Sequence, residues 1–528
     1  MLVFRDSRRS VRSHELLSEL ARALARVHEE PLAALLLAAE IECALEDRAH
    51  EAAPVARQLS DALADAWLGV RQIATPFAQE LMARLLLPDQ VELKCPEGFA
   101  FYALDPAAYA RAAARLRGPR DACVVGVRTI GTSLSAVVRA SLVRSGVAAR
   151  RLTVRPSGHP WARVLEFGPA EREFVEHHAR DCDFLVVDEG PGRSGSTFLA
   201  VAEALERHGV PAARIRLLAS HPIVAERLLA EDAPRRFARF ACEVVDAWSP
   251  PPGALDLSGG LWRRHVELRS WPPCWQTHER VKYLDAERKR LHKFSGLSRY
   301  GSRVLERARL LAEAGFAPSV EPAEAGWLAY PWLSGRPARA GVDAANAVEV
   351  LARYLAFRAA EITGPAPERG EIEAMARLNA REGAGVCVPE KFELEVVKPV
   401  VCDGHMMPHE WIVADEAWMK TDGAEHGDDH FYPGRVDSAW DVAGAVVEWN
   451  LPSALEHALV QRYAALTRDD VRRRLDSYKL AYSALRLGVA DFAERDAQAE
   501  DERDRWRAAK RHYAARLQHA ASRLTLRA

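Results

Sequence analysis

The sequence predicts an α/β protein with more than one domain, and three observations support this. The chain has 528 residues, more than one compact core usually holds, so two or three domains are expected. Between Asp121 and Ser220, short apolar runs typical of strands alternate with helical stretches, which predicts a mostly parallel sheet covered by helices. A purely helical pattern precedes this region, and a mixed pattern of strands and helices follows it.

Residues 1–95 are expected to form a helical N-terminal module. Leucines recur at helical spacing from about Ser13 to Leu87, and the composition then becomes aromatic and rich in turn residues. Three acids fall on one of these helices and are interpreted as a solvated face: Glu40, Glu42 and Asp47.

The alternating region defines a second domain, residues 96–250, whose strand-like runs are ACVVGV, RLTV, DFLVV and RIRLLAS. Proline and glycine are frequent where it ends, so residues 251–277 are expected to be a linker. An α+β domain is expected over residues 278–490, and the charged end, residues 491–528, is expected to be a solvated helix or helical pair.

Charge and cysteine content narrow the class of protein. The formal net charge is -2 with both signs interspersed, so a basic nucleic-acid footprint is not indicated. The eight cysteines form no CxxC pair, which favours reduced thiols in a cytoplasmic protein. No stretch predicts a membrane span. The expected partners are small-molecule substrates, and a homodimer is left open.

The run DFLVV ends in two adjacent acids, Asp188 and Glu189, and leads into a small-residue loop and a helix expected to begin near Ser196. Small residues let backbone N–H groups close around a phosphate, and the helix N-terminus adds its positive dipole end. Two carboxylates at the strand end can accept hydrogen bonds from ribose hydroxyls, so the pattern indicates a sugar phosphate. The expected phosphate-binding residues are Gly192, Ser194, Gly195, Ser196 and Thr197.

This pattern resembles the type I phosphoribosyltransferases over about residues 96–250. The resemblance implies that Asp188 and Glu189 are catalytic residues that bind the ribose of phosphoribosyl pyrophosphate (PRPP), and that Mg²⁺ assists the departure of pyrophosphate. The run CVVGVRTIGTSLSAVV resembles the pyrophosphate loop of the family, formed here by Arg128, Thr129, Ile130, Gly131 and Thr132. The stretch between the two elements resembles the mobile lid of the family, with Arg155, His159 and Arg163 as candidates. The phosphate loop is a residue longer than is common in the family and carries Pro191.

A second set of residues lies in the C-terminal region. A lysine on a probable strand, Lys293, is followed by a helix with Glu306 and by the apolar run from Tyr330 to Leu333. Three aspartates follow farther along the chain: Asp403, Asp422 and Asp441.

This order resembles the aminoglycoside-phosphotransferase branch of the protein-kinase-like fold. The resemblance implies that Lys293 contacts ATP phosphates and pairs with Glu306, that residues 330–333 contact adenine, and that Asp403 is the catalytic aspartate. Asp422 would bind Mg²⁺, and Asp441 would brace the catalytic loop. The family has an asparagine five residues after its catalytic aspartate, and here that position is Pro408. The second metal ligand is then missing or replaced by His409 or Glu410.

A rival interpretation uses the same region as a metal site, because imidazoles and carboxylates can bind a metal directly. Its residues are His405, His409, His426 and His430 with Asp403, Asp428 and Asp429.

Two functions follow from these patterns. The first is PRPP-dependent phosphoribosyl transfer coupled to an ATP-dependent kinase-like activity on a small-molecule or nucleotide-related substrate. The alternative is a regulatory protein that senses PRPP or a nucleotide through non-catalytic domains.

Overall fold

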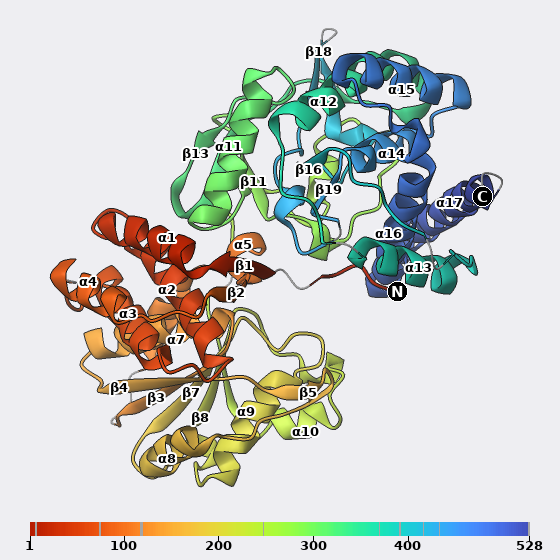
Figure 1. Cartoon of the computed structure of the whole chain (residues 1–528). Helices are drawn as coiled ribbons and strands as arrows, with labels where there is room; N and C mark the ends of the chain where they lie inside the picture. The colour runs from red at the N-terminus through yellow and green to blue at the C-terminus, as the bar shows by residue number, and fades with distance from the viewer. Residues whose placement is uncertain are drawn as a thin grey trace. The chain divides into compact units, whose positions relative to one another are not determined.

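The computed structural model describes residues 1–5, 8–72, 75–116, 120–246, 248–368, 370–389, 392–414, 417–431 and 433–525. The chain forms two compact units (Figure 1). The N-terminal unit is Ser7–Ser249 with Leu297–Arg299, and the C-terminal unit is Met1–Asp6, Pro250–Gly296 and Tyr300–Ala528. The helices expected to form a separate module thus share one unit with the sheet, and the expected linker 251–277 belongs to the C-terminal unit.

The N-terminal unit is built on a five-stranded parallel sheet with the order β4-β3-β7-β8-β9. Its strands are β3 (Ala122–Val127), β4 (Ala149–Val154), β7 (Asp183–Val187), β8 (Ile215–Ala219) and β9 (Ala241–Val244). The expected parallel sheet is therefore confirmed. From β3 the chain moves to β4 on one side and then returns to β7 on the other, so the order reverses between β3 and β7. Ligands of such sheets bind beyond the carboxyl ends of the strands at this point of reversal.

Helices and a hairpin complete the sheet region. The helix α9 begins at Ser196, as the sequence predicts. The bounds are α5 (Glu97–Phe101), α6 (Pro106–Arg115), α7 (Ile130–Arg144), β5 (Ser157–His159), β6 (Ala162–Val164), α8 (Pro169–His178), α9 (Ser196–Arg207) and α10 (Ala233–Phe237).

The N-terminal helices pack against α7 in one apolar cluster, which includes Leu16, Leu35 and Leu59 together with Val137. Their bounds are α1 (Ser13–Ala25), α2 (Pro31–Glu46), α3 (Ala53–Trp67) and α4 (Thr75–Ala83), and β1 (Arg8–Arg12) pairs with β2 (Gln90–Lys94). Strong helix formers and alanines along α2 allow it to be buried over most of its length.

The interpretation of the α2 acids as a solvated face is wrong. Glu42 is fully buried and forms an ion pair with Arg151 of β4 at 2.7 Å. Glu40 pairs with Arg299, and Asp47 pairs with Arg155 at 2.6 Å. Glu40 and Glu42 are buried because arginines from distant segments neutralise them, whereas Asp47, the residue after α2, is exposed.

The C-terminal unit contains an antiparallel sheet with the order β10-β11-β12-β14-β13. Its strands are β10 (Leu255–Asp256), β11 (Lys282–Asp285), β12 (Arg290–Phe294), β13 (Glu321–Pro322) and β14 (Trp327–Pro331). The helix α11 (Arg299–Glu313) follows β12 in the chain. The sheet carries Lys293 on β12 and the start of the apolar run 330–333 on β14, and the helix α11 carries Glu306.

Helices and two small sheets form the rest of this unit. The strand pair β16 (Pro399–Val401) and β19 (Arg435–Asp437) and the sheet of β15 (Arg336–Pro337), β17 (Trp411–Ala414) and β18 (Ala417–Lys420) hold the loops that carry Asp403 and Asp422. The helices are α12 (Ala340–Glu361), α13 (Glu371–Ala384), α14 (Ala439–Glu448), α15 (Ser453–Thr467), α16 (Leu475–Asp496) and α17 (Glu500–Thr525). In the charged C-terminal region, α17 packs Trp506 and Leu517 into the core of the unit, so it is only partly solvated. None of the helices in the described ranges combines the length and apolarity needed to cross a bilayer.

Candidate functional site

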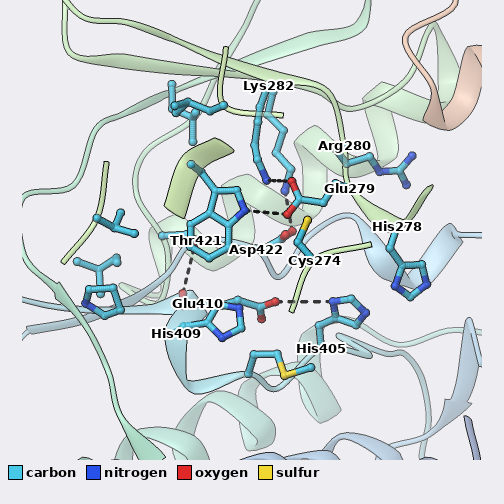
Figure 2. A pocket seen from close by; sticks show the side chains of 18 of the residues that line it. Cys274, His278, Glu279, Arg280, Lys282, His405, His409, Glu410, Thr421 and Asp422 are labelled. Atoms are coloured by element: carbon cyan, nitrogen blue, oxygen red, sulfur yellow. Dashed lines mark hydrogen bonds and ion pairs between the residues drawn. The ribbon is translucent and has the colours of Figure 1, made fainter. Parts of the chain in front are cut away.

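A cavity lies in the C-terminal unit, and its lining comes from the segments 257–282, 291–337 and 405–426 together with Arg486 and Trp506 (Figure 2). Its volume is about 190 Å³, whereas a single buried water needs roughly 10–15 Å³ on the same measure. The lining includes residues 330–333, as expected for the apolar run, and residues of the expected linker. Polar and charged residues of the lining include His278, Glu279, Arg280, Lys282, Lys293, His405, His409, Glu410, Thr421, Asp422, His426 and Arg486. A concave, largely apolar site with a few converging polar groups is typical of small-molecule binding.

Lys293 lies on β12, the third strand of its sheet in chain order, and is 3% exposed. Its Nζ donates to Asp422 Oδ1 at 2.6 Å and lies 3.1 Å from Glu425 Oε1. Burial by itself lowers the pKa of Lys293, but the two carboxylates outweigh this effect and the pKa is raised. The lysine is therefore a fixed positive charge at the cavity wall.

The expected ion pair between Lys293 and Glu306 is not formed. Glu306 is exposed on α11, and Lys293 pairs instead with the acids that follow β18. Helical periodicity places Glu306 on a helix but does not decide whether that face of α11 meets β12.

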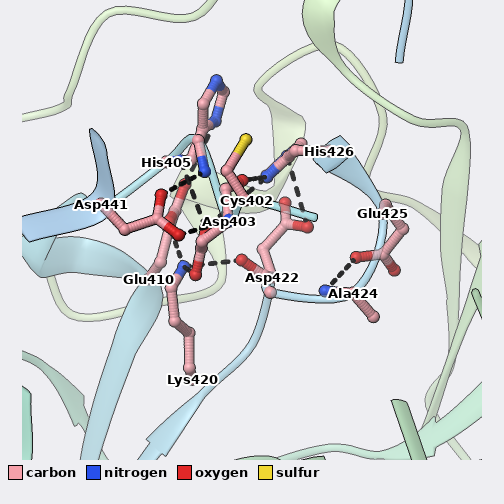
Figure 3. A network of polar contacts seen from close by, with 12 residues as sticks. Cys402, Asp403, His405, Glu410, Lys420, Asp422, Ala424, Glu425, His426 and Asp441 are labelled. Atoms are coloured by element: carbon pink, nitrogen blue, oxygen red, sulfur yellow. Dashed lines mark hydrogen bonds and ion pairs between the residues drawn. The ribbon is translucent and has the colours of Figure 1, made fainter. Parts of the chain in front are cut away.

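Asp422 lies in the loop after β18 and faces the cavity. His426 Nε2 is 3.5 Å from Asp422 Oδ1 (Figure 3). The same oxygen accepts the hydrogen bond from Lys293. Burial raises the pKa of Asp422, but Lys293 and His426 outweigh it and hold the pKa well below its usual range. Asp422 is thus ionised, which a metal-binding carboxylate requires.

Asp403 is 1% exposed and is not among the residues that line the cavity. It accepts a hydrogen bond from the Tyr354 hydroxyl, and Lys420 Nζ lies 3.4 Å away. The backbone N–H groups of Asp403 and Gly404 donate to Asp441 at 2.8 and 3.0 Å. The Asp441 carboxylate thereby fixes the start of this loop. The Asp403 carboxylate contacts the interior of the unit, and its Oδ1 lies 3.9 Å from Nδ1 of the cavity-lining His426.

His405 and Glu410 line the cavity, and the assignment of roles from sequence overlooked His405. His405 Nδ1 is 3.7 Å from Glu410 Oε1, and the centroid of its ring is 4.0 Å from that of His426. The signal was present in the sequence, because Glu410 follows His405 by five residues, the spacing expected between the catalytic aspartate and the asparagine. The same spacing is therefore also met by a register of the loop that lies two residues later, with His405 and Glu410 in place of Asp403 and Pro408.

The two replacements considered for the missing asparagine differ in their surroundings. The His409 ring stacks on Trp262 with centroids 5.6 Å apart. Glu410 accepts a hydrogen bond from Lys420 Nζ at 2.6 Å. The pKa of Glu410 is raised, mainly because the carboxyl group is buried, and the nearby Lys420 partly offsets this rise.

The rival interpretation as a histidine metal site is not supported by the geometry. His430 stacks on Phe4 with centroids 5.5 Å apart and does not line the cavity, and His409, which does line it beside His405 and His426, stacks on Trp262. Within the described ranges, no group of three or more His, Cys, Asp or Glu side chains is arranged to hold a metal ion. The side chain of Asp428 lies outside what is described.

The segment expected to be a linker forms one wall of the cavity, between β10 and β11. Trp262 Nε1 donates to Glu279 Oε1 at 2.8 Å, and Glu279 pairs with Lys282 at 2.8 Å. On its other side the segment is held by Glu502 of α17, which accepts from Arg263 at 2.9 Å and from the Cys274 N–H at 2.6 Å. Proline and glycine suggested a linker, but Trp262 and Cys274 of this segment line the cavity, and three hydrogen bonds hold the segment in place.

In the N-terminal unit, Asp188 and Glu189 lie at the carboxyl end of β7, next to the point of strand-order reversal. The Tyr109 hydroxyl donates to the Asp188 carbonyl at 2.7 Å, which fixes the backbone there. Desolvation raises the pKa of Asp188 to about 7. Desolvation and the neighbouring Asp188 raise that of Glu189 to about 8. Polar partners such as ribose hydroxyls would compensate these carboxylates.

The loop that follows has the conformation expected of a tight small-residue turn. Gly192 and Gly195 have φ of 57° and 71°, in the left-handed region that favours glycine, and the Gly195 N–H donates to the Pro191 carbonyl at 2.8 Å. Ser194 Oγ and Ser196 Oγ are 2.9 Å apart, and Ser196 Oγ donates to the Pro160 carbonyl at 2.6 Å. Thr197 lies half-buried in the first turn of α9.

The loop after β3 is strained and closely packed. Thr129 has φ of 101°, a conformation that is costly for a residue with a side chain and that often marks a functional site. Gly131 is required, because a Cβ there would lie 2.6 Å from the Val187 carbonyl. Ile130 and Thr132 are buried in the first turn of α7.

The expected anion-binding arginines are engaged by acids. Arg128 donates to Glu46 and Glu171, both at 3.2 Å. Arg155 donates to Asp47 at 2.6 Å, so it is held at the sheet edge. The other lid candidates, His159 and Arg163, lie on the hairpin β5–β6, where His159 is exposed and Arg163 half-buried.

The chain matches no model of a protein family, and no curated protein matches it. Among solved structures, a choline/ethanolamine kinase family protein from Mesorhizobium loti is 16% identical, with 46% of this chain and 88% of that chain covered at a TM-score of 0.33. A choline kinase from Streptococcus pneumoniae is 14% identical, covering 45% and 89% at 0.31. An aminoglycoside phosphotransferase is 13% identical, covering 46% and 91% at 0.28. Similarities this low decide neither the fold nor the activity of this chain.

Proposed function

We propose that the C-terminal unit is an ATP-dependent phosphotransferase acting on a small molecule. The observation that carries the proposal is the meeting of Lys293 and Asp422, far apart in the chain, at 2.6 Å on the wall of one cavity. In kinases a lysine on the third strand contacts nucleotide phosphates and an aspartate holds Mg²⁺. Residues 330–333 line the same cavity and supply an apolar face for a nucleobase.

The residues present fit a magnesium ion. Mg²⁺ is usually held by one or two carboxylates together with substrate phosphates, so a cage of three protein ligands is not expected. Asp422 supplies an ionised carboxylate at the cavity wall. When bound, the ion would neutralise charge on the phosphates. Lys293 would then exchange part of its contact with Asp422 for phosphate oxygens.

ATP turnover tests this proposal. The purified full-length chain should release ADP from ATP only when Mg²⁺ is present, and Asp422→Asn should reduce the rate about 100-fold or more because the metal is lost. Asp504→Asn, at an exposed position on α17, is the matched control and should turn over as the unmodified chain does. Equal turnover by the Asp422 variant would rule out the proposed role.

A second function is proposed for the N-terminal unit, namely binding of a ribose phosphate at Asp188, Glu189 and residues 192–197. The observation that favours it is the placement of this loop at the strand-order reversal, beside the strained Thr129. Transfer from PRPP with Mg²⁺ would in addition need cations for the pyrophosphate, and Arg128 and Arg155 would have to leave Glu46 and Asp47 to supply them. The regulatory alternative, binding without transfer, needs no such change.

Calorimetry with ribose 5-phosphate and with PRPP separates these outcomes. Binding of both, abolished in the double variant Asp188→Ala and Glu189→Ala, would support the PRPP site. Binding of ribose 5-phosphate alone would support the regulatory alternative. Undiminished affinity in the double variant would remove both carboxylates from the assignment.

A further inference from the structure

We propose that His405, and not Asp403, is the side chain that meets the acceptor hydroxyl in the cavity of the C-terminal unit. The inference rests on the phosphotransfer proposed above. It assigns a catalytic residue that differs from the aspartate implied by the family resemblance.

The backbone at Gly404 separates the two side chains. Gly404 has φ of 75°, in the left-handed region, so the chain turns sharply between Asp403 and His405. Asp403 is 1% exposed and contacts Tyr354 and Lys420, whereas His405 lines the cavity. An acceptor bound in the cavity can therefore reach the imidazole of His405 but not the carboxylate of Asp403.

His405 also lies close to the residues proposed to hold the metal and the phosphates. Its ring is 4.0 Å from that of His426 between centroids, and His426 Nε2 is 3.5 Å from Asp422 Oδ1. Asp422 in turn contacts Lys293. A phosphoryl acceptor must lie within a few ångströms of the metal and the phosphate, and His405 is the next cavity-lining group along this chain of contacts.

Asp403 acts through His405 as a positioning residue. Its Oδ1 accepts the backbone N–H of His405 at 3.2 Å, while Asp441 accepts the N–H groups of Asp403 and Gly404. These bonds fix the backbone that presents the imidazole. The Asp403 carboxylate thus accepts hydrogen bonds from groups of the protein itself.

The step assigned to His405 is a simple displacement. The acceptor oxygen forms a bond to the γ-phosphorus of ATP, and the bond from that phosphorus to the bridging oxygen breaks, so ADP leaves with the electron pair. The hydroxyl proton passes to a ring nitrogen of His405 and then to solvent. Groups in this position orient the attacking hydroxyl and accept its proton.

The test uses water as the acceptor, so no substrate need be known. The full-length chain and its His405→Ala, His405→Asp and Asp403→Asn variants are compared for phosphate release from Mg-ATP and for affinity towards a non-hydrolysable ATP analogue. We expect His405→Ala to slow release about 100-fold or more while the dissociation constant of the analogue changes less than about twofold. His405→Asp should recover part of the rate, since a carboxylate there can also accept the proton. His457→Ala, an exposed histidine on α15, is the control and should be unaffected.

Three results would overturn the assignment. One is an undiminished rate in His405→Ala. Another is loss of release in Asp403→Asn at unchanged melting temperature while His405→Ala stays active. The third is an unmodified chain that binds the analogue but releases no phosphate. A chain that binds no nucleotide would instead overturn the proposed function itself.

Discussion

At the residue scale, the C-terminal cavity depends on charges that are paired with each other before any ligand arrives. Lys293 neutralises Asp422 and Glu425, and Lys420 neutralises Glu410 and Asp403. Buried charges are tolerated only with such partners. A ligand with phosphates and a metal can take over these contacts without leaving a charge unpaired, which makes the site suited to a metal-bound nucleotide.

Replacing Lys293 tests its contact with phosphates. Lys293→Met should weaken binding of an ATP analogue by about 10- to 100-fold, because a hydrogen bond to a charged group is worth roughly 1.5–3 kcal/mol. Lys289→Met, at the exposed turn between β11 and β12, is the matched control and should bind as before. Calorimetric dissociation constants decide, and equal affinity in both variants would exclude Lys293 from the nucleotide site.

The acid pair of the N-terminal unit makes a pH-dependent prediction. Asp188 and Glu189 have pKa values raised to about 7 and about 8, above those of an unfolded chain. The folded state therefore holds protons that the unfolded state has released, so the stability present at low pH is lost as the pH rises from about 4 towards 8.

Melting temperatures measured between pH 5 and pH 8.5 check this. We expect the melting temperature of the unmodified chain to fall over this range, and that of the double variant Asp188→Asn and Glu189→Gln to fall less. Parallel curves for the two proteins would show that these acids do not titrate in the folded state.

At the element scale, α2 is tied to the sheet by ion pairs. Glu42 of α2 and Arg151 of β4 are both completely buried, and Arg151 also pairs with Asp61 of α3 at 2.5 Å. A helix whose acids are matched by arginines of a strand is part of the sheet unit, which explains why residues 8–95 do not form a compact unit of their own.

Breaking one of these pairs should be costly. Glu42→Gln should lower the free energy of unfolding by about 3 kcal/mol, since the buried Arg151 then keeps only the partly exposed Asp61 as its partner. Glu92→Gln removes the partner of Arg8 in a largely exposed pair and should cost at most about 1 kcal/mol. The free energies of unfolding of both variants are measured with denaturant at the first unfolding transition. Similar losses in the two variants would contradict a structural role for the buried pair.

At the scale of the whole molecule, local patterns in the sequence predicted local structure well. The apolar runs gave the strands of the parallel sheet, and the small-residue loop gave the start of α9 at Ser196. The order of Lys293 and Asp422 predicted that they share a site, because a distinctive set of residues over a long stretch is hard to produce by chance.

The features that could not be predicted from the sequence depend on residues that are distant in the chain. The face of α11 that carries Glu306 is exposed, and nothing local to the helix indicates this. The roles of Asp403 and His405 depend on the left-handed turn at Gly404. Glu42 and Asp47 form ion pairs with arginines that lie about a hundred residues later in the chain. The prolines and glycines of residues 251–277 predicted a linker, whereas contacts with α17 hold this segment in the C-terminal unit.

The most direct test of the central claim is a calorimetric titration of the full-length chain with a non-hydrolysable ATP analogue, with and without Mg²⁺. The proposed site predicts one binding event that is strengthened at least about tenfold by Mg²⁺, and an affinity in Asp422→Asn that no longer depends on the metal. Absence of binding, or binding that is the same with and without Mg²⁺ in the unmodified chain, would contradict a nucleotide-dependent phosphotransferase in this cavity.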